Sequence, residues 1–431
     1  MFTEKDLDQL TTKNISIETI EKQLSYFRSG FPFLQIDKAA TVNDGIQKFT
    51  EEIIDLFEEN FEKNRKERKI LKFVPASGAA TRMFKELYEF ISSPDDQENP
   101  SVKEVFDRLT DFAFYQELKS ILEEKHIPIH HKKNVAEAIL LKDGLNYGNL
   151  PKGLLLFHKY PDGPRTAMEE HLVEGAEYTR NTDKNIHLHF TVSSEHQDDF
   201  EKLVRERIKK YMELFNVSFD ITFSQQKPST DTIAVDKNNL PMRNHDGSLL
   251  FRPGGHGALL DNLNELDGDI IFIKNIDNVV PDRLKRTTIR YKKALAGLLL
   301  DLQEKVFQYI HILNESLDRT TITEIVAFLK QSLSFQVPDA FTEWDMEKQK
   351  EYLLNTLNRP IRVCGMVRNE GEPGGGPFWV HNVDHSVSLQ IAESSQINMN
   401  DPQQQSIAAN ATHFNPVDLV CAVKDHHGHR F

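Results

Sequence analysis

Cysteine is scarce in this chain of 431 residues, which contains only Cys364 and Cys421. The two do not form a pair with metal-site spacing, and such scarcity is typical of a reducing compartment. The first residues, 1–6, lack the basic start and apolar run of a signal peptide. The longest apolar runs, such as residues 294–300, are too short to span a membrane. We therefore expect a cytoplasmic protein without a membrane partner.

Positively charged residues are also fewer than negatively charged ones. The chain has 52 Lys and Arg against 66 Asp and Glu, a formal net charge of -14. Such a surface repels nucleic acid and anionic membranes, so we expect no nucleic-acid partner. A site for an anionic nucleotide must then be built locally from basic side chains, glycine loops or a metal. The 39% hydrophobic content is that of an ordinary soluble globular protein.

The residue pattern predicts an α/β protein with three parts. Residues 1–65 form a helical N-terminal segment with an amphipathic stripe. Residues 66–300 alternate strands and helices, with a helical insertion at about 92–148, which favours a mostly parallel sheet with flanking helices. Ligands of such sheets bind beyond the carboxyl ends of the strands. Residues 301–431 are helical and then contain strands, and we expect this part to be mixed α/β with a shortened C-terminus.

A turn of small residues between a predicted strand and a predicted helix is the most informative motif. It reads Pro75-Ala76-Ser77-Gly78-Ala79-Ala80-Thr81-Arg82. Small side chains let a phosphate reach backbone amides, and a helix that begins there adds the positive end of its dipole. The guanidinium of Arg82 suits phosphate oxygens. A turn that is small only for packing reasons, with Arg82 on the surface, is an equally good interpretation of the motif by itself.

Other segments offer charge or close backbone approach. Lys152, in a Pro-Lys-Gly sequence before a strand, is suited to neutralise a phosphate. Gly254, Gly255 and Gly257 precede a helical pattern and let the main chain approach a ring or a phosphate. Asp277 follows a buried strand and is suited to hold Mg²⁺. A solvated lysine, a tight helix cap and a turn-capping aspartate are the plain structural alternatives.

The order and spacing of these segments resemble the nucleotide-sugar pyrophosphorylases, and most of all the UTP–sugar-1-phosphate uridylyltransferases. The opening loop of that family reads Gly-Gly-x-Gly-Thr-Arg; Gly78, Thr81 and Arg82 match it, whereas Ser77 and Ala80 replace glycines. The resemblance covers roughly residues 71–278 and implies a glycosyltransferase-A-like, Rossmann-like fold. The whole chain also resembles an uncharacterised bacterial family of unknown function that shares this superfamily.

The resemblance implies nucleotidyl transfer. An oxygen of a sugar-1-phosphate attacks the α-phosphorus of a nucleoside triphosphate, with UTP favoured, and pyrophosphate leaves. The resemblance assigns catalysis to Arg82 at the pyrophosphate, Lys152 at the α-phosphate and Asp277 with Mg²⁺ as the cofactor. It assigns nucleotide binding to Ala76, Ser77, Gly78, Thr81, Gln225 or Gln226, Gly254, Gly255 and Gly257. Such chemistry depends on positioning and on neutralising charge, and it needs no dedicated general base.

Two other functions compete with this hypothesis. A non-catalytic nucleotide-sugar sensor or scaffold of the same fold is favoured by Ser77 and Ala80, which stand where the resembled family has glycine. A glycosyltransferase ranks last, because we find no paired-Asp metal motif at the end of a predicted strand. The base, the sugar and the oligomeric state are not indicated by the sequence.

Overall fold

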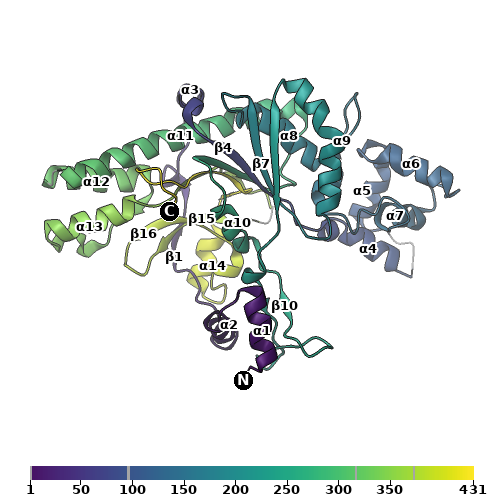
Figure 1. Cartoon of the computed structure of the whole chain (residues 1–431), viewed down its shortest axis with the longest axis horizontal. Helices are drawn as coiled ribbons and strands as arrows, with labels where there is room; N and C mark the ends of the chain where they lie inside the picture. The colour runs from purple at the N-terminus through teal and green to yellow at the C-terminus, as the bar shows by residue number, and fades with distance from the viewer. Residues whose placement is uncertain (1, 95–97, 316–317, 372–373) are drawn as a thin grey trace. The chain divides into compact units, whose positions relative to one another are not determined.

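The computed structural model describes residues 2–94, 98–315, 318–371 and 374–431, which divide into two compact units. Unit 1 consists of Met1–Leu71, Lys227–Ile273 and Arg290–Phe431. Unit 2 consists of Lys72–Gln226 and Lys274–Ile289. Each unit is therefore assembled from segments that are far apart in the sequence (Figure 1).

Unit 1 combines helices with several small groups of strands. Its α-helices are α1 (Glu4–Lys13), α2 (Ile17–Ser29), α3 (Glu51–Asn64), α10 (Leu260–Asn264), most of α11 (Asp282–Glu315), α12 (Arg319–Ser332), α13 (Met346–Leu357) and α14 (Pro402–Ala409). Its first strands are β1 (Ile36–Ala39), β2 (Thr41–Val42), β3 (Gly45–Ile46), β9 (Thr232–Ile233), β10 (Phe251–Arg252) and most of β11 (Ile270–Lys274). The later ones are β12 (Phe335–Gln336), β13 (Ile361–Cys364), β14 (Val367–Arg368), β15 (Gly376–His381), β16 (Val387–Ala392), β17 (His413–Phe414) and β18 (Asp418–Ala422).

The strands of unit 1 pair mostly in antiparallel fashion. Four of them form a sheet in the order β1-β15-β16-β12, in which each neighbouring pair is antiparallel. Strand β18 lies between β13 and β11, and its pairing with β13 is antiparallel. Buried residues of α11, α12 and α13 form one hydrophobic core, and α1 and α2 pack on the β9–β10 hairpin in another.

Unit 2 carries the alternating α/β part of the chain. Its strands are β4 (Ile70–Pro75, from Lys72 on), β5 (Leu156–His158), β6 (Arg165–Thr166), β7 (Asn185–Thr191) and β8 (Ser218–Ser224). Its α-helices are α4 (Lys85–Ser92), α5 (Pro100–Asp107), α6 (Tyr115–Glu124), α7 (Lys132–Leu140), α8 (Ala167–Tyr178) and α9 (Gln197–Phe215). Two 3-10 turns, η2 (Ala80–Arg82) and η4 (Lys152–Leu154), precede α4 and β5.

The sheet of unit 2 is parallel where its pairing is defined. Strands β7 and β8 are parallel along their whole length, from Asn185↔Ser218 to Thr191↔Ser224. Strand β4 is the other neighbour of β7. The Ala76 amide, just beyond β4, donates to the Thr191 carbonyl at 2.8 Å, so the carboxyl ends of β4 and β7 meet. These carboxyl ends form the edge where ligands bind in α/β sheets.

The fold is mixed α/β, as expected, and the strand pairing is mixed. Strands β7 and β8 are parallel and lie in the part of the chain for which a mostly parallel sheet was predicted, whereas β13 and β18, in the C-terminal part, are antiparallel. Apolar β-patterns do not record strand direction, which is set by the connections. The N-terminal region is not helical throughout, because the chain forms β1 between α2 and α3. Strand β1 depends on its long-range partner β15, which local periodicity does not show.

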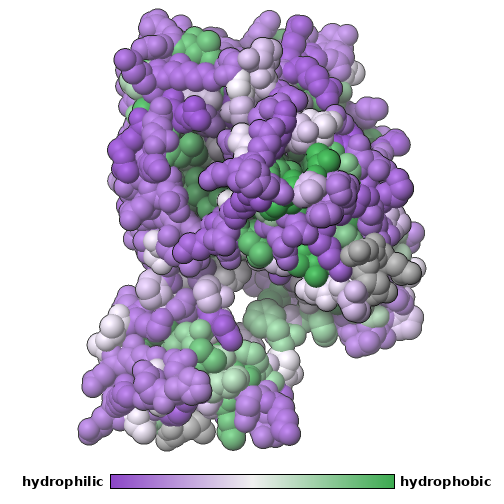
Figure 2. All heavy atoms as spheres, turned by 90° about the vertical axis from the view of Figure 1, so that its right-hand side faces the viewer, coloured by the Kyte–Doolittle hydropathy of each residue, from purple (hydrophilic) through white to green (hydrophobic). Residues whose placement is uncertain are grey.

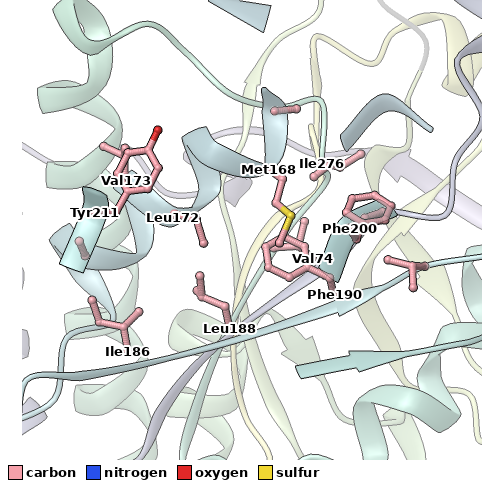
Figure 3. Packing of buried hydrophobic residues seen from close by; sticks show 14 of the residues in the cluster. Val74, Met168, Leu172, Val173, Ile186, Leu188, Phe190, Phe200, Tyr211 and Ile276 are labelled. Atoms are coloured by element: carbon pink, nitrogen blue, oxygen red, sulfur yellow. The ribbon is translucent and has the colours of Figure 1, made fainter. Parts of the chain in front are cut away.

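Two hydrophobic cores organise unit 2. The first lies between the sheet and the helices α8 and α9, and Figure 3 shows its members Val74, Met168, Phe190, Phe200 and Ile276 gathered together. The second joins α4 to the helical insertion of α5, α6 and α7. The predicted insertion at about 92–148 contains the helices α5, α6 and α7, joined by turns, in the part that the structure describes. Helix α4 is thus held to the insertion by packing.

Helix α8 is buried although it is rich in charged residues. Its N-terminus has a capping box, in which Thr166 and Glu169 bond each other's backbone amides. One turn further along, Glu174 lies in the dry core with Lys72 Nζ at 3.0 Å and Lys274 Nζ at 2.8 Å. Tyr178 also donates to Glu174, at 3.1 Å. Charged groups are rarely this deeply buried unless they are paired, so this network is a specific feature of the fold.

Burial has opposite consequences for these charged groups. Burial in the core, helped by the charge of Lys274 and opposed by Glu174, lowers the pKa of Lys72 to about 7. Burial alone would raise the pKa of Glu174, but the charges of Lys72 and Lys274 hold that pKa well below its usual value. The carboxylate of Glu174 is therefore the charge that both lysines require.

No helix in the described ranges is long and apolar enough to cross a bilayer. The molecular face shown in Figure 2 is covered mainly by hydrophilic residues, with smaller hydrophobic patches between them.

We expect the two partners in this network to differ sharply when replaced. Glu174→Gln leaves two buried ammonium groups without a carboxylate and should lower the free energy of unfolding by about 3–5 kcal/mol. Lys72→Met removes one charge, keeps a side chain of similar volume and leaves Glu174 paired with Lys274. It should therefore change the free energy of unfolding by only about 1 kcal/mol. Urea unfolding followed by circular dichroism measures both values, and equal losses would contradict the network.

The Lys72→Met variant also tests how stability depends on pH. Between about pH 7 and the usual lysine pKa of 10.5, the unfolded chain holds the Lys72 proton and the folded chain does not. The contribution of Lys72 to stability therefore rises with pH across this window and is constant below it. Lys72→Met should lack this rise, so its free energy of unfolding should fall relative to that of the unmodified protein between about pH 7 and pH 9. A parallel pH dependence in both proteins would show that Lys72 does not titrate there.

Candidate functional site

The turn after β4 exposes backbone amides. Ala76 is buried in the core and its amide is engaged by Thr191, so this residue anchors the turn. Ser77 and Gly78 follow it and are exposed. Among the residues that the structure describes, neither amide has a hydrogen-bond partner. The amides of Ser77 and Gly78 are thus the ones available to an anion.

The residues after Gly78 lead into a helix, as the sequence predicts. Residues Ala80–Arg82 form a 3-10 turn, which the sequence did not indicate, and α4 begins at Lys85. The positive end of the α4 dipole therefore lies several residues beyond Gly78. Ala80 is buried in the core of the helical insertion, whereas Thr81 and Arg82 are exposed. The Ala80 side chain that replaces a glycine of the resembled family is accommodated by packing.

Arg82 is available as a cation. Its side chain is exposed on η2 and has no hydrogen bond or ion pair within the described ranges of the chain. An unpaired guanidinium close to free amides is suited to bind a phosphate with both arms of its fork.

Lys152 lies beside the turn. The Lys152 amide donates to the Gly78 carbonyl at 3.2 Å, and Pro151 and Ala79 form an antiparallel bridge. Gly153 follows Lys152 and is packed tightly, because a Cβ at this position would lie 2.6 Å from the Phe200 ring and 3.3 Å from the Ile276 side chain. The glycine of the Pro-Lys-Gly segment is therefore required by the core, and the lysine is carried on a rigid support.

Asp277 completes the arrangement. It follows Ile276, whose side chain is buried in the unit 2 core. The Asp277 Oδ2 atom accepts a hydrogen bond from Lys152 Nζ at 2.5 Å, and both side chains are partly exposed. The structure thus brings together the turn after β4, the Pro-Lys-Gly segment and Asp277, three residues beyond β11, which are far apart in the sequence.

The remaining predicted residues lie in other places. Gln225 and Gln226 follow β8 directly, and Gln225 donates to the Gln197 side chain at 3.0 Å. Both glutamines belong to unit 2 and lie just after β8, the strand that neighbours β7. The glycines Gly254, Gly255 and Gly257 belong to unit 1, where they follow the β9–β10 hairpin. Gly255 and Gly257 face open space within that unit, since an added Cβ would meet nothing within 4 Å.

Sequence reasoning missed several polar groups close to this edge of unit 2. The hydroxyls of Thr191 and Ser193, at and after the end of β7, are buried and have no partner among the described residues. His171 on α8 is also buried and bonds the carbonyl that precedes Asp277. Periodicity places Thr191 in a strand and His171 in a helix but does not show what they face. The signal in the sequence that could have indicated these residues is a polar side chain at a position where the pattern predicts burial.

No group of three or more potential metal ligands among His, Cys, Asp and Glu occurs in the described part of the chain. Asp277 is a single carboxylate, so any hard cation here would draw its other ligands from substrate phosphates and water. Mg²⁺ commonly binds proteins in that way.

Two glycines of the site are expected to respond differently to alanine. Gly78→Ala should leave the melting temperature unchanged, because an added Cβ meets nothing within 4 Å and the backbone needs no left-handed conformation. Gly153→Ala should lose about 1–3 kcal/mol of stability, because its Cβ would overlap the buried Phe200 ring. If Gly78 is kept for ligand approach, Gly78→Ala should weaken the binding of a nucleoside triphosphate in calorimetric titration. A destabilised Gly78→Ala variant would contradict this assignment.

Comparisons with known proteins place the chain in a family. No curated protein matches the sequence. Similar solved structures are a uridine diphosphate N-acetylglucosamine pyrophosphorylase from Trypanosoma brucei in complex with an inhibitor (11% identity, TM-score 0.43), a UDP-glucose phosphorylase from Trypanosoma brucei (13%, 0.40) and a mutant UDP-glucose pyrophosphorylase from Leishmania major in complex with UDP-glucose (11%, 0.37). In each case the similarity covers 97% of this chain and 62% of the other. Residues 3–431 match the family model described as domain of unknown function DUF4301, and the chain belongs to that family.

Proposed function

We propose that this protein is a sugar-1-phosphate nucleotidyltransferase. A phosphate oxygen of the sugar-1-phosphate forms a bond to the α-phosphorus of a nucleoside triphosphate, UTP being favoured by the sequence resemblance. The bond between the α-phosphorus and the bridging oxygen breaks, and pyrophosphate leaves with that oxygen. The attacking phosphate is already ionised, so the protein must position the reactants and neutralise their charge.

The observation that carries this proposal is the chain of contacts around Lys152. Its backbone bonds the phosphate-turn candidate at Gly78, and its side chain bonds Asp277. A cation, a carboxylate and free amides are thereby held together next to the carboxyl ends of the unit 2 strands, which is the place where α/β sheets bind ligands. The sequence motif alone did not require these segments to meet.

The chemistry of each residue suggests its role in the proposed reaction. The amides of Ser77 and Gly78 donate to phosphate oxygens, and Arg82 neutralises the departing pyrophosphate. Lys152 is paired with Asp277. We propose that its ammonium turns from this carboxylate to the α-phosphate when a nucleotide binds, since a phosphate offers more negative charge than one carboxylate.

Asp277 has the chemistry of a Mg²⁺ ligand. One of its oxygens bonds Lys152, and its side chain is partly exposed, so a carboxylate oxygen is accessible to a hydrated cation. A bound Mg²⁺ would neutralise charge on the phosphates of both substrates. Asp277 is the protein residue that we propose to hold it.

A non-catalytic nucleotide-sugar sensor is the second candidate. Ser77 favours it, because its exposed side chain stands where the resembled family has glycine. Thermal shift with UTP and Mg²⁺ separates these hypotheses when followed by pyrophosphate release with a panel of sugar-1-phosphates. Stabilisation without pyrophosphate release would favour the sensor, and the absence of stabilisation by any nucleoside triphosphate would exclude both functions.

Substitutions at the charged residues test the assigned roles. Arg82→Ala and Asp277→Ala should each lower kcat/KM for pyrophosphate release by about 100-fold, the scale seen when one preorganised charge-stabilising group is removed. Arg108→Ala is the matched control, because Arg108 is an exposed arginine that forms surface ion pairs with Glu104 and Asp111 in the insertion. Unchanged release in both site variants would show that the assignment is wrong.

A further inference from the structure

His171 makes a hydrogen bond to the backbone next to Asp277. It lies on α8 and is completely buried. Its Nε2 atom is 3.1 Å from the carbonyl oxygen of Ile276. A carbonyl oxygen only accepts hydrogen bonds, so Nε2 carries the proton of the neutral ring. Ile276 immediately precedes Asp277.

The other ring nitrogen of His171 has no partner. Its Nδ1 atom is buried and makes no hydrogen bond within the described residues. Burial, helped by the charge of Lys72, holds the pKa of His171 well below its usual value. The ring is therefore neutral, with a proton on Nε2 and a bare lone pair on Nδ1. A buried polar atom without a partner is costly, and a leucine here would avoid that cost, so the hydrogen bond to Ile276 calls for an explanation.

Ile276 is fixed at its side chain as well as at its carbonyl. Its side chain packs with Val74 and Phe200 in the core of unit 2 (Figure 3). Gly153, in the Pro-Lys-Gly segment, packs against Phe200 and against Ile276 itself. Lys152 precedes Gly153 and Asp277 follows Ile276, so each member of the ion pair is one residue away from this shared packing.

We propose that His171 is a positioning residue, whose Nε2–H fixes the Ile276 carbonyl and thereby directs the Asp277 carboxylate toward Lys152. Ile276 and Asp277 are the central residues of a turn in which the Asn278 amide donates to the Asn275 carbonyl at 3.1 Å, and such a turn accepts more than one orientation of its central peptide plane. The bond to His171 fixes that plane, and the direction of the next Cα–Cβ bond follows from it. The catalytic consequence rests on the proposed nucleotidyl transfer, whereas the structural statement about Lys152 and Asp277 does not.

The tautomer of His171 can be measured directly. Long-range proton–nitrogen correlation spectra of the full-length protein should show one histidine locked as the neutral Nε2–H form, and this signal should vanish in His171→Gln. The neutral Nδ1–H tautomer would overturn the proposal, because it leaves Nε2 without a proton to donate to the Ile276 carbonyl.

The effect on the ion pair can be measured without turnover. Acylation of Lys152 by a water-soluble ester, followed by peptide mass spectrometry, reports how firmly Asp277 holds its ammonium. His171→Leu has similar volume and no donor, and it should raise the labelling rate of Lys152 by about fivefold, the scale of a partly exposed ion pair. His171→Gln keeps a donor near the Nε2 position and should restore slow labelling.

A matched control separates positioning from general loosening of α8. His158→Leu removes a histidine that bonds Glu170 of α8 at 3.0 Å and has no hydrogen bond to Ile276 among the described residues. It should leave the Lys152 labelling rate unchanged. Equal acceleration in His158→Leu and His171→Leu, or no rescue by His171→Gln, would reduce His171 to a structural residue and overturn the proposal.

Kinetics then tests the link to catalysis separately. In pyrophosphate release, His171→Leu should lower kcat by about tenfold with KM nearly unchanged, because misdirection affects the reacting geometry more than binding. If labelling behaves as expected but no nucleoside triphosphate is turned over by the unmodified protein, the proposed function fails while the positioning role stands. If turnover is present and labelling does not respond, the positioning role fails.

Discussion

The pairing of Lys152 with Asp277 depends on the close approach of Gly153 to Phe200 and Ile276. Only a residue without Cβ permits this approach, because a methyl group would lie 2.6 Å from the buried Phe200 ring. The packing fixes two segments of unit 2 that are far apart in the sequence, and each charged residue is adjacent to it. A half-exposed ion pair contributes little stability by itself, so its geometry is set by the hydrophobic core beneath it.

A buried charge network supports the same region from the other side. Helix α8 carries Glu174, which holds Lys72 of β4 and Lys274 of β11, and one turn earlier it carries His171, which holds Ile276. Strand β4 leads into the turn at Ser77 and Gly78, and β11 leads to Asp277. The carboxylate and the imidazole of one helix therefore bond residues that lie in or just after the two strands that lead into the candidate site. Ion pairs of this kind seldom add net stability, and here we interpret them as specifying the arrangement of the strands.

Much of the local structure could be predicted from the sequence, because it is written in short-range patterns. The alternation of strands and helices predicted for residues 66–300 is present in β7, α9 and β8, and the apolar residues from Phe200 to Phe215 recur at helical spacing within α9. Strand direction, the role of β1 and the burial of Ala80 could not be predicted, because each depends on a partner far along the chain. The family resemblance assigned Lys152 and Asp277 to one nucleotide site, but it did not predict that their side chains form an ion pair. The burial of the charged residues of α8 could not be predicted, because a buried Glu–Lys network has the same residue pattern as the polar face of a surface helix.

We propose above all that the turn after β4, the Pro-Lys-Gly segment and Asp277 form the phosphate-binding part of a nucleotide site. Crystals of the full chain grown with UTP and Mg²⁺ test it most directly. The account predicts electron density for the phosphates against the amides of Ser77 and Gly78, with the Lys152 ammonium moved from Asp277 to the α-phosphate. Phosphate density elsewhere, or a Lys152–Asp277 pair that is unchanged with nucleotide bound, would contradict it.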